Sequence, residues 1–292
     1  MTETNDYRPV VARQARRLSV RGLDYCVNEW GDEDAPLVFY LHGWADTGST
    51  FQFVVDALGP GWRVIAPDWR GFGQSAHGDG PYWFPDYLAD LNEILRQYSQ
   101  DEPVKLVGHR MGGNIASLYA GVMPERVEAI VNIEGFGLTD SNPVDAPRRY
   151  RAWLKAMDGG AGFSIYPDFE NLAERIRSRN PSLSKSQADF VARQWASLKD
   201  GAVHLRADPK HKLPNAVLYR RAEAEACWRQ ITAPVLLVSG DGSPFARELG
   251  DPASLPFPGS QLCTIPAAGH MIHFDAPELL ATQIQQFLFK TL

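Results

Sequence analysis

The chain has 292 residues, which is enough for one large α/β domain with an insertion or for two modest domains. Its 44% hydrophobic and 22% charged residues are typical of a globular protein. The net charge of −6 argues against nucleic acid as the main partner, because proteins that bind phosphates present a basic surface.

Cysteine usage and the N-terminus indicate where the protein works. Cys26, Cys227 and Cys263 have neither metal-ligand spacing nor a paired framework, so we expect three free thiols in a reducing compartment. The N-terminal residues contain no apolar stretch of a signal peptide. No apolar run approaches the length of about 18 residues that a spanning helix needs. These features predict a cytoplasmic protein with no membrane partner.

Strands alternate with helices over the first half of the chain. The strands are predicted at 17–22, 23–30, 36–41, 62–66, 104–107 and 127–133, and the helices at 49–58, 86–98 and 115–122. The first two strands alternate in polarity like an antiparallel hairpin, whereas the third is apolar throughout, as in a strand buried on both faces. The pattern predicts a mostly parallel sheet with helices on both faces.

The alternation stops between residues 139 and 228 and resumes with strands at 234–240 and 261–265. The interrupting segment has no strand-like run and carries helical patches, such as Tyr150, Trp153, Leu154 and Met157. We therefore predict a helical cap at 139–228, inserted into a core of 1–138 and 229–292. The segment holds 15 Lys and Arg against 11 Asp and Glu, a balance of +4, whereas the rest of the chain has a balance of −10. A basic cap could attract a carboxylate or phosphate, although solvated arginines on helix surfaces give the same balance.

A short stretch from Val104 to Asn114 organises the chain. An apolar strand leads into Gly108-His-Arg110-Met-Gly112, and a helical pattern follows, which is the layout of a nucleophile elbow. This tight turn lifts one side chain above the sheet and needs glycine on both sides, because its backbone is strained and closely packed. The raised position holds Arg110, whose guanidinium stays protonated and cannot attack a carbonyl.

The sequence resembles the α/β-hydrolase superfamily over nearly its whole length. The resemblance rests on motifs in that family's chain order: His42-Gly43-Trp44 at a strand end, Pro67-Asp-Trp-Arg-Gly-Phe-Gly-Gln-Ser75, the Gly108 to Gly113 frame, and Gly269-His270 followed by Phe274-Asp275-x-Pro277-Glu278. It implies an α/β-hydrolase fold, with a mostly parallel eight-stranded sheet and a cap that roofs the pocket and shapes substrate choice.

The same resemblance implies roles for particular residues. His270, after the last strand, would be the base that activates a nucleophile. The backbone N–H groups of Trp44 and Met111 would form the oxyanion hole, which depends on backbone geometry and so survives a changed side chain at position 110. The implied activity is hydrolysis of small, partly apolar esters or related acyl compounds. The expected partner is a small-molecule substrate or ligand, with no cofactor and no metal.

The acid that orients the base has two candidates. Many family members place Asp three residues after the glycine that ends the seventh strand, but that position, counted from Gly240, is Ser243. Haloalkane-dehalogenase-like members place the acid at the end of the sixth strand, where Glu134 stands in this chain. We favour Glu134, because a carboxylate at a buried strand end is costly without a partner. Asp241 is the alternative, and it also fits a plain turn residue before glycine.

Arg110 leaves three interpretations open. The chain descends from a serine hydrolase and has lost covalent catalysis, or the arginine is an artificial or incidental variant of an active enzyme. In the third interpretation Arg110 has a new task, either binding an anionic ligand in a non-catalytic or regulatory protein or pairing with Glu134 beside His270. With arginine at the apex we expect covalent turnover to be absent or very low.

Two further histidines receive no chemical role from the sequence. His109 is the variable residue of the elbow and is expected to be buried beneath it. His273 is expected near the mouth of the pocket.

Overall fold

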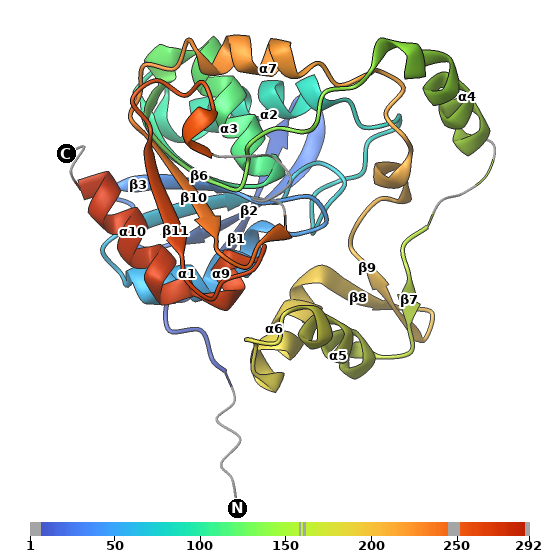
Figure 1. The fold of residues 1–292 in the computed structure, drawn as a ribbon. Coiled ribbons are helices and arrows are strands. Elements are labelled where there is room, and N and C mark those ends of the chain that lie inside the picture. Colours follow the sequence, from blue (N-terminus) through green and yellow to red (C-terminus); the bar gives the residue numbers. More distant parts are fainter. Residues whose placement is uncertain (1–6, 158, 160–161, 245–251, 290–292) are drawn as a thin grey trace, which may run out of the picture.

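The structure is a computed structural model that describes residues 7–157, 159, 162–244 and 252–289. Its centre is an eight-stranded sheet in the order β1-β2-β4-β3-β5-β6-β10-β11 (Figure 1). The strands are β1 (Gln14–Val20), β2 (Leu23–Trp30), β3 (Leu37–Leu41), β4 (Arg63–Pro67), β5 (Val104–His109), β6 (Val127–Ile133), β10 (Val235–Gly240) and β11 (Gln261–Ile265). The first six residues, on which the expectation of no signal peptide partly rests, lie outside the described residues.

Strand direction follows the polarity patterns of the sequence. The pairs β1–β2 and β2–β4 are antiparallel, and the pairings from β4 through β11 are parallel. All six residues of β5 and of β10 are buried, as expected for strands covered on both faces, whereas β1 at the edge is largely exposed. The predicted fold class, a mostly parallel eight-stranded α/β-hydrolase sheet, is confirmed.

Helices cover both faces of the sheet. One face carries α1 (Gln52–Leu58) and α10 (Pro277–Phe289), and the other carries α2 (Phe84–Ser99), α3 (Met111–Val122) and α7 (Arg221–Trp228). Val54 and Ile284 belong to the buried cluster of the first face, and Leu91, Ile115 and Trp228 to that of the second. None of the described helices is both long and apolar enough to cross a membrane.

The segment 139–228 is not purely helical. It contains α4 (Ala146–Met157), β7 (Ile165–Tyr166), α5 (Phe169–Arg179), α6 (Lys185–Trp195), β8 (Ala196–Lys199) and β9 (Ala202–Leu205). The three strands form a small antiparallel sheet in the order β7-β9-β8, so the expectation of no strand is wrong. Strands of two to four residues are too short for alternation of polarity to predict. The segment ends with α7, which packs against α3 of the core, so its boundary at residue 228 stays a prediction.

Two helices of this segment are capped and anchored. The Asp168 carboxylate accepts the Asn171 N–H at the start of α5, and Ser184 forms a capping box with Gln187 at the start of α6. Their apolar faces share one buried cluster with residues of the core, among them Phe274 of α9 (Ile272–Asp275). The inserted segment is therefore packed against the core beside the loop that carries His270.

Candidate active site

The sharp turn between β5 and α3 has the geometry of a nucleophile elbow. Its apex, Arg110, has φ 48° and ψ −104°, a conformation that costs a non-glycine residue about 1–3 kcal/mol. The backbone is held from both sides: Arg110 N–H donates to the Ile133 carbonyl at 2.8 Å, and Asn114 N–H donates to the Arg110 carbonyl at 2.9 Å. These bonds fix the apex over the ends of β5 and β6.

The flanking glycines fill places that no larger residue fits. A Cβ on Gly112 would lie 1.9 Å from the Leu41 carbonyl oxygen, and a Cβ on Gly108 would lie 2.6 Å from the backbone of Gly112. Distances below 3.0 Å force the backbone to move, and here both neighbours are main-chain atoms. These close contacts explain why the elbow needs glycine on both sides of its apex.

His270 and Glu134 lie together beside the elbow. His270 Nδ1 is 2.7 Å from Glu134 Oε2, although 136 positions separate the two residues in the chain. The Glu134 side chain is fully buried, and its carboxylate also accepts the Gly240 N–H at 3.1 Å and the Ser243 hydroxyl at 2.8 Å. A buried carboxylate needs such donors, and three of them hold this one in a single orientation.

The two candidates for the acid occupy different environments. Asp241 is exposed in the turn after β10, where its N–H donates to the Ile265 carbonyl at 3.1 Å. Glu134 is buried and in direct contact with His270. Ser243, at the position where many relatives of this fold place Asp, instead supports Glu134 through its hydroxyl. The geometry favours Glu134, and its role as the acid stays a prediction.

The Arg110 side chain is partly buried and reaches toward the loop after β6. Its Nη1 donates to the Gly137 carbonyl at 3.0 Å. Of the two predicted oxyanion donors, Met111 comes directly after Arg110 as the first residue of α3, and Trp44 lies in the loop after β3. A backbone N–H at a helix N-terminus lies in the positive field of the helix dipole, which favours an anion. The half-exposed Trp44 ring packs against Phe163 of the inserted segment, with ring centroids 5.9 Å apart.

A buried polar brace that the sequence did not reveal supports these loops. The expectation that His273 lies near the pocket mouth is wrong: it is fully buried, and its Nε2 is 3.2 Å from Asp46 Oδ2. Asp46 Oδ1 also accepts the Trp195 indole N–H, at 2.7 Å, from the end of α6. Since Asp46 lies two residues after Trp44, this carboxylate ties together the loop after β3, helix α9 and the inserted segment. We call Asp46 and His273 the brace pair.

His109 extends this network toward His270. As expected, it is buried beneath the elbow, and its Nε2 is 3.0 Å from the main-chain oxygen of His270. Burial, together with the neighbouring His273 and His270, holds the pKa of His109 well below its usual value, so the ring stays neutral. A neutral imidazole can donate from Nε2 to this carbonyl, which fixes the backbone that carries His270.

Hydrogen bonds hold the Asp46 carboxylate in its buried position. Burial alone would raise the pKa of Asp46, but hydrogen bonds and charge from His273, with the Thr50 hydroxyl, lower it below the ordinary value. Asp46, His273 and His109 offer one carboxylate and two imidazoles within 4.8 Å of one another, which are possible metal ligands. Both oxygens of Asp46 already have protein partners, since Oδ1 accepts the Thr50 hydroxyl and the Trp195 indole N–H, and Oδ2 lies 3.2 Å from His273 Nε2.

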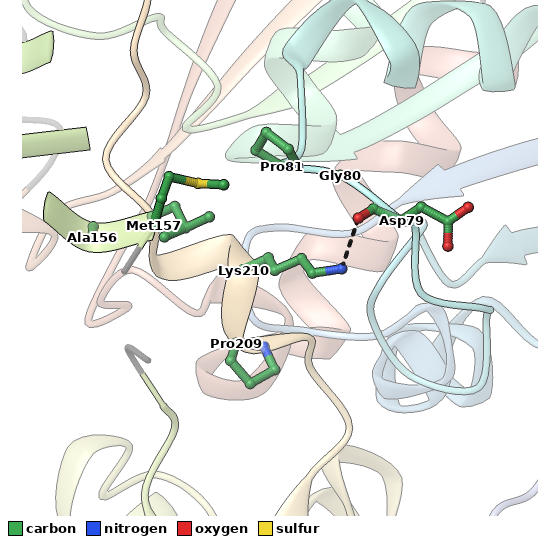
Figure 2. A pocket seen from close by; sticks show the side chains of 8 residues that line it. Asp79, Gly80, Pro81, Ala156, Met157, Pro209 and Lys210 are labelled. Atoms are coloured by element: carbon green, nitrogen blue, oxygen red, sulfur yellow. Dashed lines mark hydrogen bonds between the residues drawn. The ribbon is translucent and has the colours of Figure 1, made fainter. Parts of the chain in front are cut away.

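A separate cavity of about 210 Å³ lies between the end of α4 and the loop after β4 (Figure 2). It is lined by Asp79, Gly80, Pro81, Ala156, Met157, Pro209, Lys210 and Leu213. Figure 2 shows the Lys210 ammonium turned to the main-chain oxygen of Asp79, at 3.1 Å, so that its aliphatic stem faces the cavity. Arg110, Glu134 and His270 are not among the lining residues, so this apolar space is distinct from the elbow.

The fold and the elbow define the class of this protein. The model of the alpha/beta hydrolase fold family matches residues 36–277, and the chain belongs to this family. It is similar to a serine hydrolase-like protein of Danio rerio, with 29% identity over 89% of this chain and 83% of that protein.

Two further comparisons agree with this assignment. A 2-(acetamidomethylene)succinate hydrolase of Mesorhizobium japonicum is 24% identical over 94% of this chain and 95% of its own length. Among solved structures, a thioesterase domain from the curacin biosynthetic pathway superposes with a TM-score of 0.83 at 27% identity, over 94% of this chain and 99% of that domain. The family is one of hydrolases of the serine hydrolase and esterase type.

Proposed function

We propose that the chain is a serine-hydrolase scaffold for small, partly apolar esters or related acyl compounds, with Arg110 in the nucleophile's place. The observation that carries the proposal is the 2.7 Å contact between His270 Nδ1 and the buried Glu134 carboxylate, next to an intact elbow. A protonated guanidinium cannot form an acyl intermediate, so covalent turnover is absent or very low in this sequence.

The rest of the machinery matches what a serine at position 110 would need. In an Arg110→Ser variant the hydroxyl would attack the acyl carbonyl, and His270 would take its proton at Nε2. Glu134 would hold His270 in the tautomer with the proton on Nδ1 and stabilise the imidazolium. The N–H groups of Trp44 and Met111 would receive the negative charge that develops on the carbonyl oxygen.

The retained strain at position 110 supports this proposal. An apex with φ 48° is costly for arginine, and a scaffold with no use for the elbow would gain stability by relaxing it or by placing glycine there. The turn instead keeps its closely packed glycines and its hydrogen bond to Ile133. The backbone thus remains arranged for a side chain that projects above the sheet.

The second candidate function is binding of a carboxylate ligand without turnover. Arg110 is a fixed cation at the N-terminus of α3, where the helix dipole adds to its attraction for anions. The partly buried guanidinium is held in place by the hydrogen bond from its Nη1 to the Gly137 carbonyl. A relative named for hydrolysis of a substituted succinate supports a carboxylate-bearing ligand at the elbow.

Two experiments separate these candidates. For the scaffold, Arg110→Ser and Arg110→Ala are assayed with short p-nitrophenyl esters beside the parent chain. Only the serine variant is expected to turn over, and His270→Ala in that background should abolish the activity. A folded Arg110→Ser variant that stays inert would count against the serine-hydrolase scaffold.

For the ligand, a panel of mono- and dicarboxylates is screened by thermal shift. The parent is expected to gain stability with a carboxylate, and Arg110→Ala to lose that gain. Equal stabilisation of both proteins, or none of either, would rule out Arg110 as the anion site.

A further inference from the structure

Helix α4 (Ala146–Met157) lies at the periphery of the molecule, at the upper right of Figure 1. The structure describes all twelve of its residues, and none of them is buried. The helix meets the chain at the cavity beside Lys210, and Arg149 Nη1 donates to the Asn215 main-chain oxygen at 3.2 Å. In globular proteins most of a helix's stability comes from packing an apolar face against a core, which the described residues do not provide for α4.

That face is strongly apolar. Tyr150, Trp153, Leu154 and Met157 are spaced i, i+3, i+4 and i+7, which places them in one stripe along the helix. Tyr150 is 52% exposed, Leu154 58% and Met157 50%. A contiguous apolar stripe of this kind marks an interaction site rather than the ordinary scatter of apolar residues over a surface.

Positive charge borders the stripe. The helix carries Arg148, Arg149, Arg151 and Lys155, and the sequence between Ala146 and Met157 has no acidic residue. At 3.6 residues per turn, Arg149 and Arg151 project roughly 100° to either side of the stripe. Arginines at these flanks can bury their stems against an apolar layer while their guanidinium groups reach its charged border.

We propose that α4 docks the protein on an anionic lipid surface. The apolar stripe would enter the boundary between headgroups and acyl chains, and Arg149 and Arg151 would lie among the headgroup phosphates. The distribution of charge orients the molecule in the same sense, because the segment 139–228 has a balance of +4 and the remainder −10. The basic segment would face the lipid and the acidic core would face water.

The alternative occupants fit this helix less well. Two copies of α4 packed stripe to stripe across a two-fold axis would bring the flanking Arg149 and Arg151 of each helix together, with no acidic residue within either helix to offset them. A polyanion such as nucleic acid would use the positive charges but would leave the apolar stripe in water. A lipid surface satisfies both features at once. The sequence-based expectation of no membrane partner rests on the absence of a spanning run, which a helix lying in the interface does not need.

The docked helix would also place the apolar cavity at the lipid surface. Ala156 and Met157, at the end of α4, belong both to the helix and to the lining of the 210 Å³ cavity (Figure 2). Met157 is at the same time the last member of the stripe. Apolar compounds that leave the membrane would therefore meet this cavity first.

The test is flotation of the full chain with vesicles of phosphatidylcholine alone and of phosphatidylcholine mixed with phosphatidylglycerol. We expect binding to the mixed vesicles that weakens as salt is raised, and little binding to phosphatidylcholine alone. Leu154→Asp and Arg151→Glu should each weaken binding at least about tenfold. The matched controls Leu198→Asp and Lys199→Glu change exposed residues of β8 and should leave binding unchanged.

Any of three results would overturn the proposal. The first is absence of binding to the mixed vesicles, and the second is equal loss of binding in the β8 controls. The third is a dimer of the parent chain in light scattering that Leu154→Asp converts to a monomer, because α4 would then be an interface between copies. Both readouts are independent of hydrolysis, so they stand or fall separately from the proposed function.

Discussion

In most proteins polar side chains lie at the surface and large apolar side chains lie in the core. The surroundings of the elbow and helix α4 depart from this division in opposite ways. Around the elbow, Glu134, Asp46, His109 and His273 are polar and buried. Along α4, Tyr150, Leu154 and Met157 are large, apolar and exposed. Each departure costs free energy unless a partner compensates it.

The partners are found in different places. The buried polar groups find theirs within the chain: His270 for Glu134, His273 for Asp46, and the His270 carbonyl for His109. Among the described residues none buries the α4 stripe. Substitutions near the elbow should therefore act through folding stability, whereas substitutions on α4 should act on an external partner and leave stability unchanged.

The largest expected effect is that of Gly112→Ala. Its Cβ would lie 1.9 Å from the Leu41 carbonyl oxygen, so either the turn or β3 must move. We expect a loss of about 3 kcal/mol or more in the free energy of unfolding, measured by urea denaturation. Gly61→Ala is the control, since no atom lies within 4 Å of its added Cβ. Similar losses in the two variants would show that the elbow is not closely packed.

The brace pair comes next. Asp46→Ala leaves His273 buried without its carboxylate and removes the acceptor of the Trp195 indole N–H. Leaving a buried hydrogen-bonding group without its partner costs about 1–3 kcal/mol, and two groups lose theirs here. We therefore expect a loss of about 3 kcal/mol in the free energy of unfolding, measured by urea denaturation. The control, Asp145→Ala, removes an exposed ion pair with Arg148 and should cost less than about 1 kcal/mol. If Asp46→Ala is as mild as this control, Asp46 does not hold the loops together.

A pH effect of intermediate size is expected from His211. Its ring lies between those of Phe72 and Tyr82, with centroids 3.7 and 3.6 Å away, and burial lowers its pKa to about 4. Between pH 6.5 and 4 the unfolded chain binds a proton at this residue that the folded chain does not, so stability falls as pH falls.

His211→Phe keeps the ring and removes the titration. Between pH 6.5 and 4, the variant should lose less free energy of unfolding than the parent, by about 1 kcal/mol per pH unit. The measurement is urea denaturation at pH 6.5, 5.5 and 4.5. Some pH dependence should remain, because burial also lowers the pKa values of His42 and His109. Identical pH profiles for the parent and the variant would contradict this assignment.

The smallest effect on stability is expected on α4. Leu154→Asp replaces an exposed side chain that has no core to leave, so the free energy of unfolding should change by less than about 0.5 kcal/mol. A loss of several kcal/mol in the free energy of unfolding would contradict this expectation, because it would mean that α4 is packed against other residues in solution.

Much of the fold could be predicted from the sequence because its signals are local. Strand periodicity, the glycines around Arg110 and the order of the motifs each depend on residues close together in the chain. Glu134 and His270 follow the ends of different strands, and parallel strands bring their ends to one edge of the sheet. Their proximity could therefore be predicted before any coordinates were known.

The remaining features depend on contacts that periodicity cannot detect. The brace pair joins residues 227 positions apart, and nothing adjacent to His273 in the sequence indicates Asp46 as its partner. The sheet of β7, β8 and β9 has strands too short to show alternation. The sequence shows the amphipathic pattern of α4, but it cannot tell whether the apolar stripe is buried, because buried and exposed stripes have the same spacing.

We propose that position 110 alone separates this scaffold from a working serine hydrolase. This is tested by comparing the initial rates of p-nitrophenyl acetate hydrolysis by Arg110→Ser, Arg110→Ala and the parent chain. The serine variant should exceed the other two at least about 100-fold, because it alone has an activated nucleophile. A correctly folded Arg110→Ser variant no faster than Arg110→Ala would contradict the proposal.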